Sequence, residues 1–124
     1  MNVILPKNCF IFVETFKTME NYKFVYPTGI ELISKEREEQ LCKHGRTVEG
    51  DVEMNNHYQL SEAAGILTCL DTDDLLVNSD ECCPVEWDEV GWKKLFEKPY
   101  EQRLVIAGAL IAAEIDRLNY IKQQ

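Results

Sequence analysis

The closing part of the chain constrains the fold more than any other stretch. From Leu104 to Ala113 every residue is apolar or glycine, and charged residues begin again at Glu114. A helix that is apolar on nearly every side is buried in a protein or in a membrane. Ten residues are too few to cross a bilayer, which takes about 20. The stretch therefore predicts a central, buried helix of a soluble protein, extending over about Tyr100–Ile121.

Small residues inside this helix predict close contact with neighbouring helices. They are Ala107, Gly108, Ala109, Ala112 and Ala113. Short side chains let two helix backbones approach, so we expect Gly108 and Ala112 to lie at a close crossing. We also expect this helix to be the most buried element.

The rest of the chain predicts one mainly α domain over residues 1–124, because 124 residues with 45% hydrophobic content can bury a core. We expect a three-helix core over 29–121 and a small N-terminal antiparallel β-hairpin extension over 1–28. The hairpin is predicted from Cys9–Phe16 and Tyr22–Tyr26, which are rich in aromatic and branched residues. A lone hairpin is marginally stable, so it would pack on the helices or on a second copy, which makes a homo-oligomer possible.

Two further helices are predicted before the closing one. The first spans about Ile30–His44 and stops at Gly45. The second spans about Tyr58–Leu70, and Arg46–Asn56 between them is expected to be a loop. The second helix should bury Leu60, Ala63, Ala64 and Leu67. On the first helix, one face carries Ile33, Arg37, Gln40, Leu41 and His44.

Negative charge is concentrated in one segment. The formal net charge is −9, and residues 71–89 contain no lysine or arginine but hold Asp71, Asp73, Asp74, Asp80, Glu81, Glu86, Asp88 and Glu89. This charge argues against nucleic-acid binding, which depends on neutralising phosphates. The segment is either a solvated acidic loop or a surface that docks on a basic host or defence protein.

The cysteines and the N-terminus predict a cytoplasmic protein. Five cysteines are present, none in a Cys-x-x-Cys pair, and Met1–Pro6 lacks a basic start followed by a long apolar stretch. Cys82 and Cys83 are adjacent, but no second pair accompanies them, so we expect no metal and no cofactor. No membrane association is expected.

Several motifs resemble a widespread group of small phage and prophage proteins. These have a Glu-Arg-x-x-Gln helix, a Gly-Trp-Thr turn, a Trp-rich linker and a closing Ala-Gly-Ala-Leu-Ile-x-Ala-Glu-Ile-x-Arg-Leu helix. The matching residues here are Glu36, Arg37 and Gln40, the Gly45–Thr47 turn, the linker residues Trp87, Asp88, Trp92 and Lys93, and the helix Ala107–Leu118. The resemblance covers about Gly29–Asn119 and implies a protein of the host-cell cytoplasm.

Some members of this group resemble helical nucleotide pyrophosphohydrolase modules, which hold magnesium with clustered carboxylates. This chain departs from that pattern. Arg46 replaces a tryptophan, Glu49-Gly50-Asp51 replaces His-Asp-Asp, and Gln59 replaces a glutamate. No Glu-x-x-Glu and Glu-x-x-Asp pair is predicted on facing helices. We therefore assign no catalytic residue, and a magnesium-dependent pyrophosphohydrolase remains the alternative. The Gly-x-Thr turn also resembles the ryanodine-receptor repeat module, which implies nucleotide binding.

Arg37 has two interpretations. A cation on a core-facing stripe needs a partner, and Glu114 of the closing helix is the candidate in a structural bridge. Alternatively, Arg37 lines a pocket and binds an anion, since guanidinium matches phosphate bidentately.

Trp87 and Trp92 also allow two interpretations, as core or lid residues or as stacking partners of a nucleobase. Nearby cations would supply phosphate contacts. The full predicted ligand site is Arg37, Gln40, Arg46, Thr47, Trp87, Trp92, Lys93 and Arg103. We expect an accessory protein that binds a nucleotide-derived ligand, such as a defence signalling nucleotide, rather than one that breaks bonds.

Overall fold

The computed structural model describes residues 26–70 and 79–124. These residues form no strand but five helices: α2 (Gly29–Cys42), α3 (Val48–Met54), α4 (Gln59–Leu67), α6 (Glu89–Phe96) and α7 (Tyr100–Lys122). The prediction of a mainly helical protein is confirmed. Apart from Tyr26, the predicted hairpin segments lie outside the described residues, as do positions 71–78 of the acidic segment.

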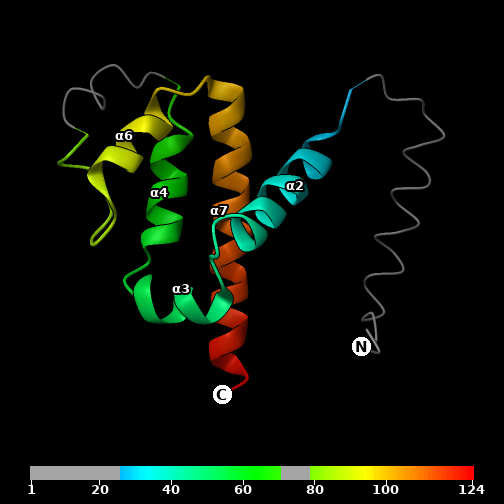
Figure 1. Cartoon of the computed structure of the whole chain (residues 1–124), viewed down its shortest axis with the longest axis vertical. Helices are drawn as coiled ribbons and strands as arrows, with labels where there is room; N and C mark the ends of the chain where they lie inside the picture. The colour runs from blue at the N-terminus through cyan, green and yellow to red at the C-terminus, as the bar shows by residue number, and fades with distance from the viewer. Residues whose placement is uncertain (1–25, 71–78) are drawn as a thin grey trace.

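Helix α7 is the scaffold on which three other helices pack. In Figure 1, α4 runs antiparallel beside it, α2 crosses it diagonally, and α3 lies across its C-terminal half. Contacts join α7 to α4, α2 and α3. The predicted central position of the closing helix is therefore confirmed. None of the described helices has the length and apolar character needed to cross a membrane.

The hydrophobic core lies between α4, α6 and α7. It contains Leu60, Ala63, Ala64, Leu67, Trp92, Phe96, Ala107, Leu110 and Ala113. All four α4 residues that the sequence predicted to be buried are in this set. Each large apolar side chain stabilises the fold by about 1.5–3 kcal/mol when it leaves water. Trp92 and Phe96 both belong to α6, and their rings meet edge to face with centroids 4.8 Å apart. The burial of both rings among α4 and α7 residues holds α6 on the core.

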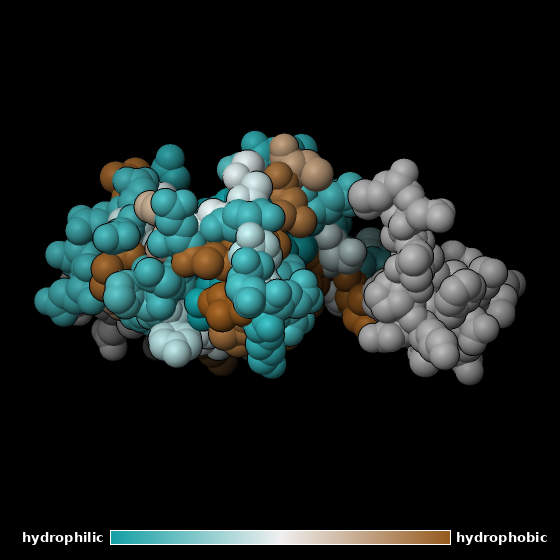
Figure 2. Space-filling view, turned by 90° about the horizontal axis from the view of Figure 1, so that it is seen from below, coloured by the Kyte–Doolittle hydropathy of each residue, from teal (hydrophilic) through white to brown (hydrophobic). Residues whose placement is uncertain are grey.

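The expectation that α7 is buried on nearly every side is wrong. Leu104, Ile111, Ile115 and Leu118 are exposed, and 47% of the Ile111 surface remains accessible. The reason is geometric, because the helices α2, α3 and α4 that pack on α7 leave the side that carries these four residues uncovered by other described residues. Viewed from the end where α7 finishes, brown apolar areas interrupt a mostly teal surface (Figure 2).

Helices α2 and α7 cross closely at Gly108, as predicted. A Cβ atom built on Gly108 would lie 2.6 Å from Cδ1 of Ile33 and 2.8 Å from its Cγ1. Carbon atoms normally pack at about 3.5–4.0 Å. The absence of a side chain at Gly108 is therefore what lets Ile33 of α2 rest on the α7 backbone.

Three local predictions are wrong. The predicted loop Arg46–Asn56 contains α3, which begins where Thr47 accepts a hydrogen bond from the Gly50 N–H at 3.0 Å. A threonine at this position satisfies one of the amide groups left free at a helix start. On α2, Arg37 and Gln40 are buried, but Leu41 is exposed because α2 has nearly reached its end at Cys42. His44, placed on the same face, lies beyond that end and is also exposed.

Candidate ligand-binding site

Two hollows meet at Arg46 and Trp87. The first has a volume of about 490 Å³ and lies between α3, α6 and the chain that precedes each helix. The second, about 600 Å³, lies between α2, the start of α7 and the end of α6. Both include Arg46, Trp87 and Leu95. Volumes of roughly 300–1,000 Å³ are typical of small-molecule sites.

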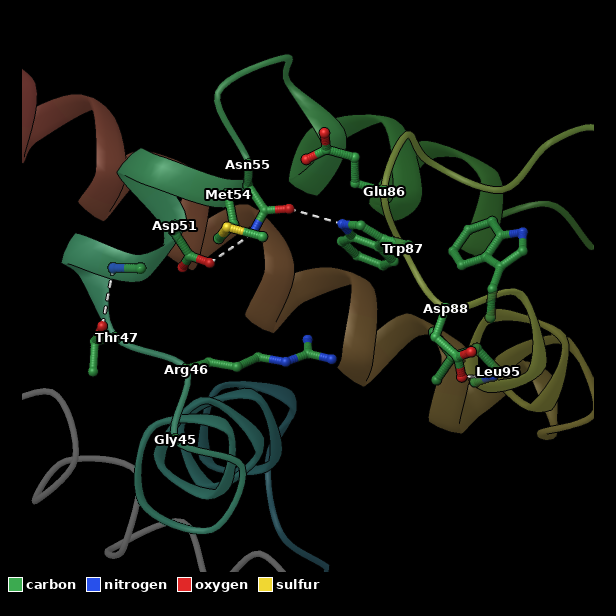
Figure 3. A pocket seen from close by; sticks show the side chains of 13 residues that line it. Gly45, Arg46, Thr47, Asp51, Met54, Asn55, Glu86, Trp87, Asp88 and Leu95 are labelled. Atoms are coloured by element: carbon green, nitrogen blue, oxygen red, sulfur yellow. Dashed lines mark hydrogen bonds between the residues drawn. The ribbon is translucent and has the colours of Figure 1, made fainter.

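Arg46 lies over the indole ring of Trp87. The central carbon of its guanidinium is 5.8 Å from the ring centroid, and the Arg46 residue is exposed. At this distance the cation is attracted to the ring face. Figure 3 shows the Arg46 side chain extending from the end of α2 towards Trp87. The pair therefore offers a positive charge and an aromatic surface in the same place.

Trp87 is held in position by a chain of hydrogen bonds that runs back to α3. Its indole N–H donates to Oδ1 of Asn55 at 2.7 Å, and Nδ2 of Asn55 donates to Oδ1 of Asp51 at 2.8 Å (Figure 3). The ring also meets Trp92 edge to face, with centroids 5.8 Å apart. Neither Asn55 nor Asp51 was among the residues predicted for the site.

Gln59 holds the segment that carries Trp87. This side chain is fully buried at the start of α4, and its Nε2 donates to the carbonyls of Met54 and Val85 at 3.2 and 3.3 Å. Its Oε1 accepts from the His57 N–H at 2.7 Å. One amide thus joins the end of α3, the start of α4 and the residue two positions before Trp87. Glutamine suits this position, because its side-chain amide both donates and accepts hydrogen bonds, whereas a glutamate carboxylate would only accept.

Glu86 adopts a left-handed backbone conformation, with φ of +69°. This conformation is uncommon for a residue with a side chain. Glu86 precedes Trp87 and lines the first hollow, and the Trp87 N–H donates to the Pro84 carbonyl at 3.1 Å. The strained turn therefore sets the direction in which the indole leaves the chain.

Asp51 is the buried acidic group of the first hollow. Only 4% of its surface is exposed, and its Oδ2 atom has no hydrogen-bond partner among the described residues. Burial raises the pKa of Asp51 above its ordinary value of 3.8, against the lowering effects of the Asn55 hydrogen bond and of the charges on Arg37 and Arg46. A nearby carboxylate, Glu114, raises this pKa further.

The predicted bridge between Arg37 and Glu114 is wrong. Arg37 Nη2 instead donates to Oδ2 of Asp116 at 3.1 Å, while Glu114 pairs with Arg117 on its own helix. The helical phase explains the difference. Asp116 lies eight residues after Gly108 and shares the stripe of α7 that α2 crosses, whereas Glu114 faces another direction. Nε and Nη1 of Arg37 are buried without a partner.

The structure brings only part of the predicted site together. Arg46, Thr47, Trp87 and Trp92 line the first hollow, and Gln40 lines the second. Trp92 is 1% exposed and serves mainly as core. Arg37 lines neither hollow.

Lys93 and Arg103 also lie outside both hollows. Lys93 is exposed on α6. Arg103 is buried, and its Nη1 donates to the carbonyls of Leu67 and Cys69 at 3.0 and 2.6 Å. A cation in this place satisfies carbonyl groups left free where α4 ends. Arg103 therefore stabilises the fold of this region.

The charges of the first hollow limit its chemistry. Its lining includes one basic residue, Arg46, and three acidic ones, Asp51, Glu86 and Asp88. Within residues 26–70 and 79–124, no three histidine, cysteine, aspartate or glutamate side chains are placed to hold a metal ion. The arrangement offers stacking, one positive charge and hydrogen bonding.

Comparison with families of known proteins, with curated proteins and with solved structures finds no match to this chain.

Proposed function

We propose that this protein is a phage-type accessory protein that binds a nucleotide-derived ligand in the host cytoplasm and sequesters it. A defence signalling nucleotide is the ligand class that we favour. The nucleobase would stack on the indole ring of Trp87, and a phosphate group would contact the guanidinium of Arg46. The observation that supports this most is the guanidinium of Arg46, 5.8 Å from the Trp87 ring centroid, where two hollows meet. A planar base joined to a phosphate uses both features.

Binding rather than catalysis is supported by how the polar groups are used. Thr47 caps α3, Asn55 is engaged by Trp87 and Asp51, and Gln59 holds backbone carbonyls. These contacts make the walls of the first hollow rigid. A preorganised site loses less free energy on ordering when a ligand binds.

A thermal-shift screen with nucleotides and cyclic nucleotides tests the proposal, because a ligand that binds only the native state raises its melting temperature. Arg46→Gln should weaken the binding of any hit by about tenfold or more, since a charged hydrogen bond contributes about 1.5–3 kcal/mol. Arg46 is exposed, so the variant should melt like the parent without ligand.

Lys43→Gln is the matched control. Lys43 is also an exposed cation near the end of α2, but it lines neither hollow. Both variants remove one positive charge from the same region. Equal losses of affinity in both would show only a general effect of charge and would contradict the assigned role of Arg46. The absence of any stabilising nucleotide would contradict the proposal itself.

Sequestration further requires that the ligand leave unchanged. After incubation with magnesium and heat denaturation of the protein, mass spectrometry should recover the intact nucleotide. Steady release of pyrophosphate would instead favour the magnesium-dependent pyrophosphohydrolase.

A further inference from the structure

One face of α7 is apolar and is left uncovered by the described residues. Its exposed side chains have accessible fractions from 38% to 52%, and they are Leu104, Ile111, Ile115 and Leu118. Together with Gly108 they follow one another at intervals of four and three residues. Two helices that pair in a coiled coil meet along a seam with this spacing. At a rise of 1.5 Å per residue, this apolar stripe runs about 21 Å along the helix.

The apolar stripe is extended by the start of α2. Ile33 rests on Gly108, and Ile30 lies one turn earlier on the same face of α2 with 49% of its surface exposed. A helix that is apolar on nearly every side is normally buried, and a run of exposed apolar side chains marks a contact surface. A partner surface is therefore needed to cover the stripe.

The charges around the stripe favour a second copy of this chain as that partner. Chains with a net charge of −9 repel each other, but no position of the stripe itself is charged. Glu101 and Lys122 continue the same spacing beyond its two ends. Neither forms an ion pair within residues 26–70 and 79–124. The stripe thus has a negative charge at one end and a positive charge at the other.

An antiparallel pair of α7 helices matches both the apolar side chains and these charges. Ile111 of each copy would lie against Ile115 of the other in the middle of the contact. At each end, Lys122 of one copy would reach Glu101 of the other. A parallel pair would instead bring like charges together at both ends. The stripe is therefore self-complementary in the antiparallel arrangement, as a two-fold dimer requires.

We propose that the protein forms an antiparallel, two-fold symmetric dimer in which the apolar stripe of α7 pairs with the same stripe of a second copy. Dimerisation covers the face of α7 that the single chain leaves exposed. The inference does not depend on the proposed function, because the stripe contains neither Arg46 nor Trp87. A contact made mainly by two single helices is small, so association should be reversible and depend on protein concentration.

Sedimentation equilibrium of the full chain tests the proposal, over concentrations from about 1 to 100 μM that bracket a micromolar dissociation constant. The parent should have the mass of two chains at the upper end. Ile115→Glu puts a charge from each copy in the middle of the contact, so it should weaken association by about tenfold or more. Val90→Glu is the control, since Val90 is an exposed apolar residue of α6 outside the stripe. Circular dichroism should show both variants folded, because both side chains are exposed.

Charge reversal tests the antiparallel arrangement. Glu101→Lys would place a lysine beside Lys122 at both ends of the contact and should weaken association by about threefold or more. This loss would occur although the substitution reduces the net negative charge that separates the two copies. Adding Lys122→Glu restores opposite charges at both ends, so the double variant should recover the affinity of the parent.

The outcomes are distinct. A parent that stays monomeric at every concentration overturns the proposal. A dimer that Ile115→Glu weakens no more than Val90→Glu also overturns it, because the copies would then meet at another surface, such as the predicted N-terminal hairpin. A dimer that is sensitive to Ile115→Glu but not to Glu101→Lys overturns the antiparallel arrangement.

Discussion

Replacing Gly108 by alanine tests the helix crossing on which the fold depends. The added methyl would lie 2.6 Å from Cδ1 and 2.8 Å from Cγ1 of Ile33, so the Ile33 side chain or α2 itself must move. Overpacking of this kind costs about 1–3 kcal/mol. Alanine also favours a helix over glycine by about 1 kcal/mol. Gly108→Ala should therefore destabilise the protein by roughly 0–2 kcal/mol in net terms.

Gly65 of α4 provides the matched control. Gly65 is exposed, and a Cβ built there meets nothing within 4 Å. Gly65→Ala should therefore show the helix-propensity gain alone, about 0.5–1 kcal/mol. The difference between the two variants, measured by urea unfolding followed by circular dichroism, isolates the packing cost at the crossing.

A second background shows whether Ile33 is the cause. Ile33→Ala removes Cδ1, Cγ1 and Cγ2, the three heavy atoms nearest to the new methyl. In this background Gly108→Ala should behave like Gly65→Ala, within about 0.5 kcal/mol. If Gly108→Ala stabilises the parent as much as Gly65→Ala does, the crossing is loose and the packing argument fails.

Three further predictions concern buried polar groups. Burial raises the Asp51 pKa above 3.8, so the folded protein binds this proton more tightly and the ionised carboxylate opposes folding as pH rises. The difference in melting temperature between Asp51→Asn and the parent should therefore shift in favour of the variant from about pH 3 to 7. A constant difference would contradict the raised pKa of Asp51. Asp116→Ala should lower the free energy of unfolding in urea by about 1–3 kcal/mol, because it leaves the buried guanidinium of Arg37 unpaired. Arg37→Met should lower it less, because it leaves only the half-exposed carboxylate of Asp116 unpaired. The reverse order would refute the pairing of Arg37 with Asp116. Asn55→Ala should cost about 1 kcal/mol, and a smaller cost in a Trp87→Phe background would confirm the indole bond.

The sequence predicted core residues and helix contacts correctly where local signals and helical packing agree. The apolar periodicity of α4 predicted Leu60 and Leu67 in the core, and the small residues of α7 predicted the crossing at Gly108. Helix α3 was missed because it has seven residues and contains Gly50. Its one local signal was Thr47, which is a good helix cap.

The candidate site was only partly predictable, for reasons of tertiary structure. Arg46 and Trp87 were named from residue type, but Asn55 meets Trp87 across 32 positions of sequence. No local pattern indicates such a contact. Arg103 was assigned to the ligand because it is a cation near tryptophans, yet its guanidinium binds α4 carbonyls. Residue type alone does not separate these two uses.

The two halves of the proposed site belong to different parts of the fold. Arg46 is tied to α2, because its N–H donates to the Gln40 carbonyl at 3.0 Å. Gly45, with φ of +62°, makes the turn that allows this bond. Trp87 is tied instead to α3 through Asn55 and to α4 through the Gln59 contact with Val85.

Both halves meet only because α2, α3 and α4 all pack on α7. A shift of α2 along its crossing at Gly108 therefore moves Arg46 relative to Trp87 without touching either residue. Since stacking and charge contacts depend on distances of a few ångströms, the spacing of the two groups is a property of the α7 scaffold. If a ligand binds at Arg46 and Trp87 as proposed, the small residues of α7 support its binding as well as the packing of the helices.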